Sequence, residues 1–158
     1  MKDMLVRLYD VKEDPSLEEK LNQKGIKFFR VLPPDIEQAV EYARTFGDGW
    51  ANECLAACTN HPASCFIAVK EKSIIGFACY DATAKDFFGP TGVSKSERGQ
   101  GIGMVLLKKC LCAMAAEGYA YAVIGGVGDA REFYEKCVDA VTIEGSSPGI
   151  YATLIKLS

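Results

Sequence analysis

The stretch Glu97–Leu106, ERGQGIGMVL, places three glycines at alternate positions directly before an apolar run. The apolar run predicts a helix over residues 101–117, in which a glycine costs about 1 kcal/mol relative to alanine. The N-terminus of a helix presents free N–H groups and a positive dipole end, which bind phosphate when no side chain covers the backbone. Gly99, Gly101 and Gly103 therefore predict a phosphate-binding loop. The alternative is a loop whose glycines only allow the helix to pack closely on a sheet.

The spacing of the glycines separates three kinds of phosphate-binding loop. A Walker loop requires a lysine and a hydroxyl residue after its last glycine, and neither follows Gly101. A Rossmann fingerprint counted from Gly99 requires a third glycine where Met104 stands. The segment Arg98–Gly103, RGQGIG, instead matches the pattern R/Q-x-x-G-x-G/A, with Val93 five residues before the arginine. This pattern resembles the acetyl-CoA-binding motif of the GNAT superfamily of N-acetyltransferases.

A second segment supports the same resemblance. Residues 129–136, DAREFYEK, are similar to the A-x-x-FYEK helix near the C-terminal end of the GNAT fold. The order of the expected elements from about residue 27 to residue 157 also resembles that fold, whereas residues 1–25 lie outside the resemblance. We therefore expect one acetyltransferase domain over residues 1–158, with residues 1–25 as an N-terminal extension.

The hydrophobic pattern predicts an α/β (α+β) fold, a mixed, mostly antiparallel sheet flanked by helices in the order β-α-α-β-β-β-α-β-α-β. The extension adds a strand over 4–9 and a short helix within 14–24. The strands of the main order are expected at 26–32, 65–69, 74–80, 87–93, 119–125 and 149–157. Its helices are expected from about 35 until Gly47, at 50–59, at 101–117 and at 129–137, the last with Asp129 as its N-cap.

The resemblance implies where the donor binds. In GNAT enzymes the strand before the glycine loop splays away from its neighbour, and the pantetheine arm of CoA pairs with its exposed backbone. Carried onto this chain, Thr91 and Val93 would bind the arm between strands 87–93 and 119–125. An amide near Gly92 or Val93 would polarise the thioester carbonyl. The pyrophosphate would be held by Arg98, Gly99, Gln100, Gly101, Ile102 and Gly103.

Tyr134 matches the family tyrosine that donates a proton to the departing CoA thiolate. A phenol has a pKa of about 10 and a thiol of about 8.5, so this transfer is close to balanced. The alternative role for Tyr134 is packing in the core beside Phe133 and Cys137. The family often has an asparagine seven residues before this tyrosine, and here that position is Val127.

The general base that deprotonates the amine has several candidates. Asp86 stands at the start of strand 87–93, and Asp81 stands at the end of strand 74–80, so either could reach the splayed cleft. Both residues are equally typical of a turn around residues 82–85. Glu53, on the helix that usually borders the acceptor pocket in this fold, is a third candidate.

Charge and composition limit the kinds of binding partner and the cellular location that are expected for this protein. The 158 residues carry 18 basic and 21 acidic side chains, a net charge of −3 without long blocks of one sign. This balance argues against nucleic acid or an anionic membrane as the main partner. The chain contains no apolar stretch near the ~20 residues that span a bilayer and no signal peptide, so a cytoplasmic location is expected.

The seven cysteines, an odd number, fit a reducing compartment. Neither Cys54 with Cys58 nor Cys110 with Cys112 has CxxC spacing, and His61 is the single histidine. These observations favour core packing of the cysteines, and no metal is expected.

The sequence thus predicts an N-acetyltransferase in which an amine directly attacks acetyl-CoA within a ternary complex, because no cysteine has a recognisable nucleophile setting. The alternative is a non-catalytic acyl-CoA-binding or sensing module, since no general base is obvious. A small-molecule or peptide amine is the expected acceptor. The extra N-terminal strand is compatible with a homodimer.

Overall fold

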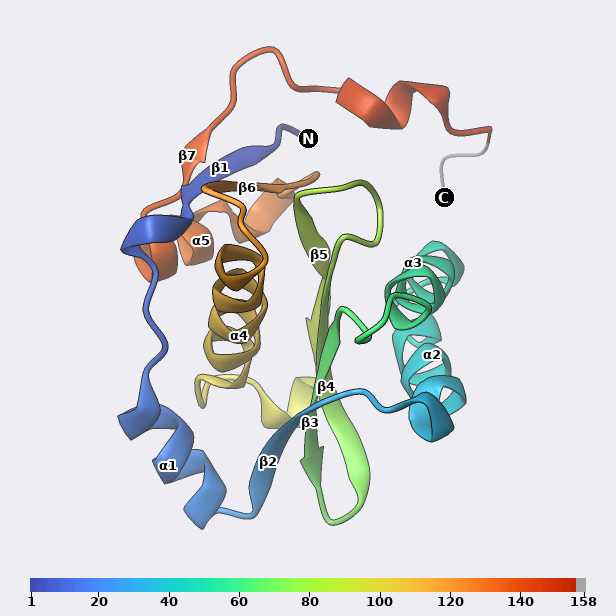
Figure 1. The fold of residues 1–158 in the computed structure, drawn as a ribbon, viewed down its shortest axis with the longest axis vertical. Coiled ribbons are helices and arrows are strands. Elements are labelled where there is room, and N and C mark those ends of the chain that lie inside the picture. Colours follow the sequence, from blue (N-terminus) through green and yellow to red (C-terminus); the bar gives the residue numbers. More distant parts are fainter. Residues whose placement is uncertain (156–158) are drawn as a thin grey trace.

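The computed structural model describes residues 1–155, which form a mixed sheet with helices on both faces (Figure 1). The sheet has seven strands in the order β2-β3-β4-β5-β6-β1-β7, and only the pair β5–β6 is parallel. The strands are β1 Met4–Arg7, β2 Ile26–Arg30, β3 Cys65–Lys70, β4 Ser73–Tyr80, β5 Phe87–Val93, β6 Tyr121–Ile124 and β7 Val141–Thr142. The predicted mostly antiparallel α/β architecture is confirmed.

The helices form two layers. Helix α4 lies on one face of the sheet, and α2 and α3 lie on the other (Figure 1). The helices are α1 Pro15–Gln23, α2 Ile36–Arg44, α3 Asp48–Cys58, α4 Ile102–Ala116 and α5 Arg131–Val138. Two separate apolar clusters follow from this layering, one under α4 and the other between the sheet and α2–α3. The near-uniform apolar composition of α4 fits its burial against several elements.

Local sequence explains several element ends. Asp14 caps α1, with its Oδ1 accepting a hydrogen bond from the Leu17 N–H at 3.1 Å, and Pro15 occupies the first turn. Gly118 follows the end of α4 in a left-handed conformation, φ +105°. The polar turn between β3 and β4 places Glu71 and Lys72 at positive φ, which suits the tight hairpin that the sequence predicts.

Two predictions at the C-terminal end are wrong. Residues Gly149–Thr153 form a 3-10 helix rather than a strand, and the seventh strand is the short β7 at the sheet edge. Residues 156 and 157 of the expected strand lie outside the described residues. Asp129 does not cap α5 either, because a 3-10 turn over Gly128–Ala130 precedes that helix and Ala130 takes the cap position.

The N-terminal strand holds the end of β6 in place. Strand β1 pairs with both β6 and β7, although residues 1–25 had no counterpart in the family pattern. The buried Asp3 accepts a hydrogen bond from the Gly126 N–H at 2.8 Å. Its backbone N–H donates to Ser146 Oγ, and its carbonyl accepts from the Ile143 N–H at 2.9 Å. Asp3 therefore joins the loop after β6 to the C-terminal segment.

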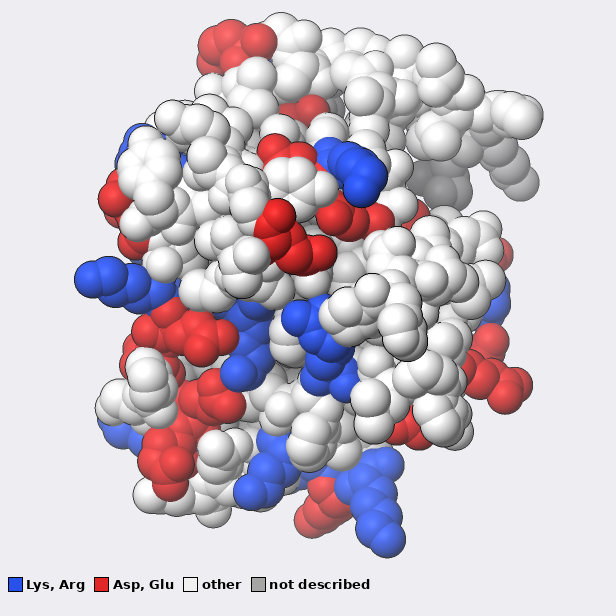
Figure 2. Space-filling model, in the orientation of Figure 1, with Lys and Arg blue, Asp and Glu red and all other residues white. Residues whose placement is uncertain are grey.

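Charges of both signs are interspersed over the middle and lower part of the face in Figure 2. The top of this face, over residues 145–155, is mostly uncharged. Among the described residues, we find no helix with both the length and the apolar character needed to cross a membrane.

Candidate active site

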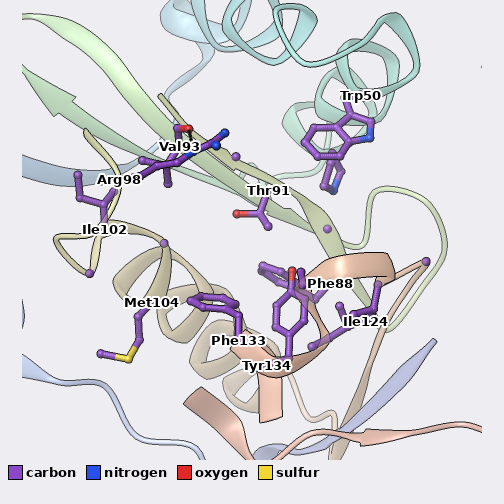
Figure 3. A pocket seen from close by; sticks show the side chains of 18 of the residues that line it. Trp50, Phe88, Thr91, Val93, Arg98, Ile102, Met104, Ile124, Phe133 and Tyr134 are labelled. Atoms are coloured by element: carbon purple, nitrogen blue, oxygen red, sulfur yellow. Dashed lines mark hydrogen bonds between the residues drawn. The ribbon is translucent and has the colours of Figure 1, made fainter. Parts of the chain in front are cut away.

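A cleft opens where the two parallel strands separate. Strands β5 and β6 pair only at Phe87 with Val123 and at Phe88 with Ile124, yet β5 continues to Val93. The cleft beyond this point has a volume of about 540 Å³ (Figure 3). Its walls come from β5, the glycine loop, the start of α4, the loop after β6, α5 and Trp50 of α3. The strand divergence, rather than a gap between domains, therefore creates the site.

The register of β4 and β5 determines which backbone groups face the cleft. The Ser94 N–H donates to the Ile75 carbonyl at 2.9 Å, so Ser94 belongs to a hydrogen-bonded pair of the antiparallel ladder. Hydrogen-bonded and non-hydrogen-bonded pairs alternate, which directs the backbone groups of Gly92 toward β4 and those of Thr91 and Val93 away from it. The Thr91 hydroxyl is engaged with the Phe77 carbonyl at 3.0 Å. The edge of β5 that faces away from β4 is thus formed by Thr91 and Val93, and of its backbone groups the Val93 carbonyl is already engaged by Arg98 Nε.

The glycine loop leaves a set of N–H groups without protein partners. Gly99 and Gly101 have φ values of +82° and +96°, and Gly101 is the N-cap of α4. The Val105 N–H bonds to the Gly101 carbonyl at 3.1 Å, so the helix uses N–H groups only from there onward. Within residues 1–155, no backbone or side-chain acceptor is found for the N–H groups of residues 99–103. These groups and the dipole of α4 can bind a phosphate.

Gly101 is also constrained from behind. A Cβ atom at this position would lie 2.9 Å from Leu17 Cδ2, so α1 packs directly under the loop. Gly103 differs, because a Cβ there would meet Phe133 Cζ at 3.7 Å and Val93 Cγ2 at 3.8 Å, which are ordinary contacts. A side chain at Gly103 would therefore be accepted by the backbone and would enter the cleft.

Charged side chains border the loop in a neutralised arrangement. Arg98 is exposed, and its Nε donates to the Val93 carbonyl at 3.0 Å. Glu97 also lines the cleft, where it accepts hydrogen bonds from Gln100 at 2.9 Å and from Lys70 at 3.2 Å. These bonds hold the pKa of Glu97 below its usual value. Because the Gln100 side chain is occupied, this residue can offer a ligand only its backbone N–H.

Tyr134 reaches the cleft from α5. Its side chain is 6% exposed and its hydroxyl points into the cleft toward the level of Thr91 (Figure 3). The ring packs edge-on against Phe88 and Phe133, with centroids 6.3 and 5.2 Å away. Burial raises the pKa of Tyr134 to about 12. The phenol is therefore protonated throughout the physiological range.

The structure brings Asp81 and Asp86 together, but not into the lining of the cleft. The Asp86 N–H donates to Asp81 Oδ1 at 2.8 Å, and the Tyr119 hydroxyl donates to Asp81 Oδ2 at 3.1 Å. Asp86 Oδ1 is buried and has no hydrogen-bond partner among the described residues. Burial, with a smaller effect from Asp81, raises the pKa of Asp86. Both carboxyl groups lie behind the closed end of the strand pair β5–β6, where the Asp86 carbonyl accepts from the Val123 N–H.

The wall opposite Tyr134 is aromatic and carries one carboxylate nearby. Trp50 lines the cleft and stacks on Phe46, with ring centroids 5.6 Å apart. Phe46 fits only because residue 92 is glycine, since a Cβ there would lie 2.7 Å from Phe46 Cζ. One helical turn after the start of α3, Glu53 accepts a hydrogen bond from Thr83.

Several of these residues were not predicted from the sequence. Leu17, Lys70 and Asp3 come from segments distant from the motif, and no local pattern marks them. Tyr151 of the C-terminal segment lies against the glycines after β6, because a Cβ at Gly125 would overlap its hydroxyl. The glycine run after β6 was the one available signal for this contact.

Comparison with known proteins agrees with this geometry. Residues 61–137 match the family described as acetyltransferase (GNAT) domain. No curated protein matches the sequence.

Solved structures share the fold at low identity. One is a fungal multi-domain β-N-acetylglucosaminidase with a GCN5-related glucosamine N-acetyltransferase region, 14% identical, with TM-score 0.67 over 90% of this chain and 19% of that one. A second, the GCN5-related N-acetyltransferase of Sphaerobacter thermophilus, is 17% identical, with TM-score 0.67 over 90% of this chain and 48% of that one. A third is a GNAT-family protein of Novosphingobium aromaticivorans, 17% identical, with TM-score 0.56 and 90% and 60% coverage. This chain spans less than two thirds of each of these proteins.

A strand pair that splays beside a glycine-rich helix start thus forms an open cleft on a mixed sheet. The chain belongs to the GNAT superfamily of acetyltransferases. This membership supports acetyl transfer as its general activity.

Proposed function

We propose that this protein is an N-acetyltransferase that moves the acetyl group of acetyl-CoA to a small-molecule or peptide amine by direct attack in a ternary complex. The observation that carries the proposal is the cleft between β5 and β6. At one end it presents unpaired N–H groups of a helix start, along one side a free strand edge, and at the other end a protonated phenol.

The residues present fit acetyl-CoA, which would supply an activated thioester. The N–H groups of residues 99–103 and the guanidinium of Arg98 would hold the pyrophosphate. The backbone of Thr91 would pair with the pantetheine arm, since the Val93 carbonyl is engaged by Arg98. Of the two amides considered for the thioester carbonyl, that of Val93 faces the cleft and that of Gly92 faces β4, so Val93 would polarise the carbonyl.

Proton movements complete the transfer. The amine nitrogen forms a bond to the acetyl carbon, and the carbon–sulfur bond breaks. Tyr134 donates a hydrogen bond from its hydroxyl to the sulfur as charge develops there, while the amine loses a proton to a base. Because burial raises the phenol pKa to about 12, above the ordinary thiol value of about 8.5, the hydroxyl stays protonated, and the hydrogen bond alone would stabilise the departing thiolate until solvent protonates it.

The single tryptophan gives a direct test of donor binding. Trp50 is the one tryptophan in the sequence and lines the cleft. We expect acetyl-CoA to change its fluorescence with saturation, and CoA release over a panel of primary amines to exceed hydrolysis without an amine. Saturable binding without CoA release for any amine would support a sensing module instead. The absence of both binding and turnover would contradict the proposal.

The identity of the general base is tested by three isosteric variants. We place Asp86 first among the candidates because its carboxylate has a raised pKa and an oxygen without a partner among the described residues, and a water chain would link it to the cleft. We expect Asp86→Asn to lower kcat about 100-fold and to remove the fall of kcat at acidic pH. Asparagine tolerates the positive φ of 68° at this position, so the turn is preserved.

Asp81→Asn is the matched control within the same turn. Glu53→Gln tests whether Glu53, on the aromatic wall of the cleft, is the general base instead. If Asp86→Asn keeps the wild-type pH profile while Glu53→Gln loses its acidic limb, the base is Glu53 and Asp86 belongs to the turn.

A further inference from the structure

Four cysteines gather on the α2–α3 side of the sheet, away from the cleft lining. The sulfur atoms of Cys54, Cys65 and Cys79 lie within 4.8 Å of one another, and all three side chains are fully buried. Cys58, 4% exposed, follows Cys54 by one helical turn, so its side chain lies on the same face of α3. Three of the seven cysteines thus form one group drawn from α3, β3 and β4, and a fourth stands one turn away.

The sheet register explains why the two strand cysteines meet. Cys65 and Cys79 are directly opposite on β3 and β4. The Tyr80 N–H bonds to the Ser64 carbonyl, while the Cys65 carbonyl accepts from Val31 on the other side. Cys65 and Cys79 therefore form a non-hydrogen-bonded pair, in which facing side chains approach most closely. Helix α3 places Cys54 and Cys58 over this pair.

We propose that Cys54, Cys58, Cys65 and Cys79 form a closed structural site for one Zn²⁺ ion. Zinc binds four thiolates tetrahedrally at about 2.3 Å, which places the sulfurs about 3.8 Å apart and agrees with the mutual distances of the Cys54, Cys65 and Cys79 sulfurs. Cys58 lies outside this group of three and would supply the fourth sulfur from the next turn of α3. All four positions are taken by the protein, so none is open for a substrate or for water. Binding releases the thiol protons to solvent as each sulfur becomes a thiolate.

The chemistry of the group favours an ion over simple packing. Thiols are weak hydrogen-bond donors and acceptors, so four of them gain little from meeting at one point. A zinc ion would join α3 to β3 and β4, and α3 carries Trp50 on the wall of the cleft.

The sequence spacing concealed this group. Cys54 and Cys58 have no CxxC pattern, and the other two ligands come from strands whose pairing brings them together. The expectation that no metal is present rested on the spacing of cysteines along the sequence. Such spacing cannot reveal a site whose ligands come from three separate elements.

Metal analysis of the full chain, purified under reducing conditions without chelator, tests the site. We expect about one Zn²⁺ per chain, and replacement by Co²⁺ should give the intense visible bands of tetrahedral cobalt thiolate. Cys54→Ala and Cys79→Ala should lose both signals. Cys110→Ala is the matched control, because Cys110 is equally buried but lies in α4 on the other face, and it should keep the metal.

Stability provides a second readout. Removing the ion with a chelator should lower the melting temperature by about 10 °C if zinc is present at ~1,000 times its dissociation constant. If the alanine variants fail to fold, the cobalt spectrum of the unsubstituted protein tests the site, because tetrahedral cobalt thiolate bands are expected there. The proposal is wrong if reduced protein, reconstituted anaerobically with excess Zn²⁺ or Co²⁺, retains no ion and gains no thermal stability. Acetyl-CoA binding by Trp50 fluorescence is measured in parallel, so failure here is distinguishable from failure of the acetyltransferase proposal.

Discussion

Gly103→Glu should eliminate acetyl-CoA binding while leaving the fold intact. Its Cβ would enter the cleft between Phe133 and Val93 at ordinary contact distances, and its carboxylate would lie at the helix start proposed to bind the pyrophosphate. Two like charges about 4 Å apart at an effective dielectric constant near 20 repel by about 4 kcal/mol, so we expect binding at least 100-fold weaker. An acidic residue in the first turn stabilises a free helix, so the melting temperature should not fall.

The choice of position matters for interpretation. Gly101 has a positive φ and contacts Leu17, so a glutamate there would disturb the loop as well as the charge. Gly103→Ala is the matched control and should change the dissociation constant by no more than about twofold. Titration of Trp50 fluorescence measures both variants. Tight binding of acetyl-CoA to Gly103→Glu would place the pyrophosphate elsewhere and remove the basis for the donor site.

Tyr134→Phe should lower kcat about 100-fold and leave the KM for acetyl-CoA nearly unchanged. The substitution removes only a hydroxyl that faces the cleft and for which the described residues supply no hydrogen-bond partner, so no buried group is left unsatisfied. Steady-state kinetics separates the two parameters, with thermal melting as the check on folding.

The pH dependence makes the assignment of Tyr134 sharper. Burial raises the pKa of Tyr134 to about 12, so its hydroxyl remains protonated as pH rises through the ordinary phenol pKa of about 10. In the wild-type enzyme kcat should therefore rise with pH as the base ionises and then stay level to at least about pH 10. A fall of kcat between pH 8 and 9, or equal losses in kcat and in acetyl-CoA affinity for Tyr134→Phe, would contradict an acid role for this residue.

The donor side could be predicted from the sequence because its chemistry is local. A glycine loop, the strand before it and the helix after it are consecutive, so the offsets of Gly99, Gly101 and Gly103 carry information without long-range contacts. The strand that splays is the one directly before the loop, as the resemblance implied. Tyr134 is more distant, but its helix has its own recognisable pattern.

The remaining features depend on contacts that sequence spacing does not encode. Leu17 under Gly101 and Asp3 at Gly126 join segments far apart in the chain. The final strand was misplaced because a two-residue edge strand has almost no hydrophobic periodicity, whereas Gly149–Leu157 has a stronger apolar pattern but forms a 3-10 turn over Gly149–Thr153. Carboxylates near a turn look alike in sequence, so the base could not be selected from Asp81, Asp86 and Glu53.

The place of β1 between β6 and β7 has a consequence for the order of folding. Strands β3 to β5 follow one another through short connections, and β2 pairs with β3 across α2 and α3, but Met4 must meet Ile124 before the second half of the sheet is complete. Contacts of such long sequence separation form slowly because the intervening chain must first lose its freedom. We therefore expect strands β2 to β5 to gain protection from hydrogen exchange first during refolding. The ability to bind acetyl-CoA should arrive in the last kinetic phase, when the first strand of the chain closes against the sixth.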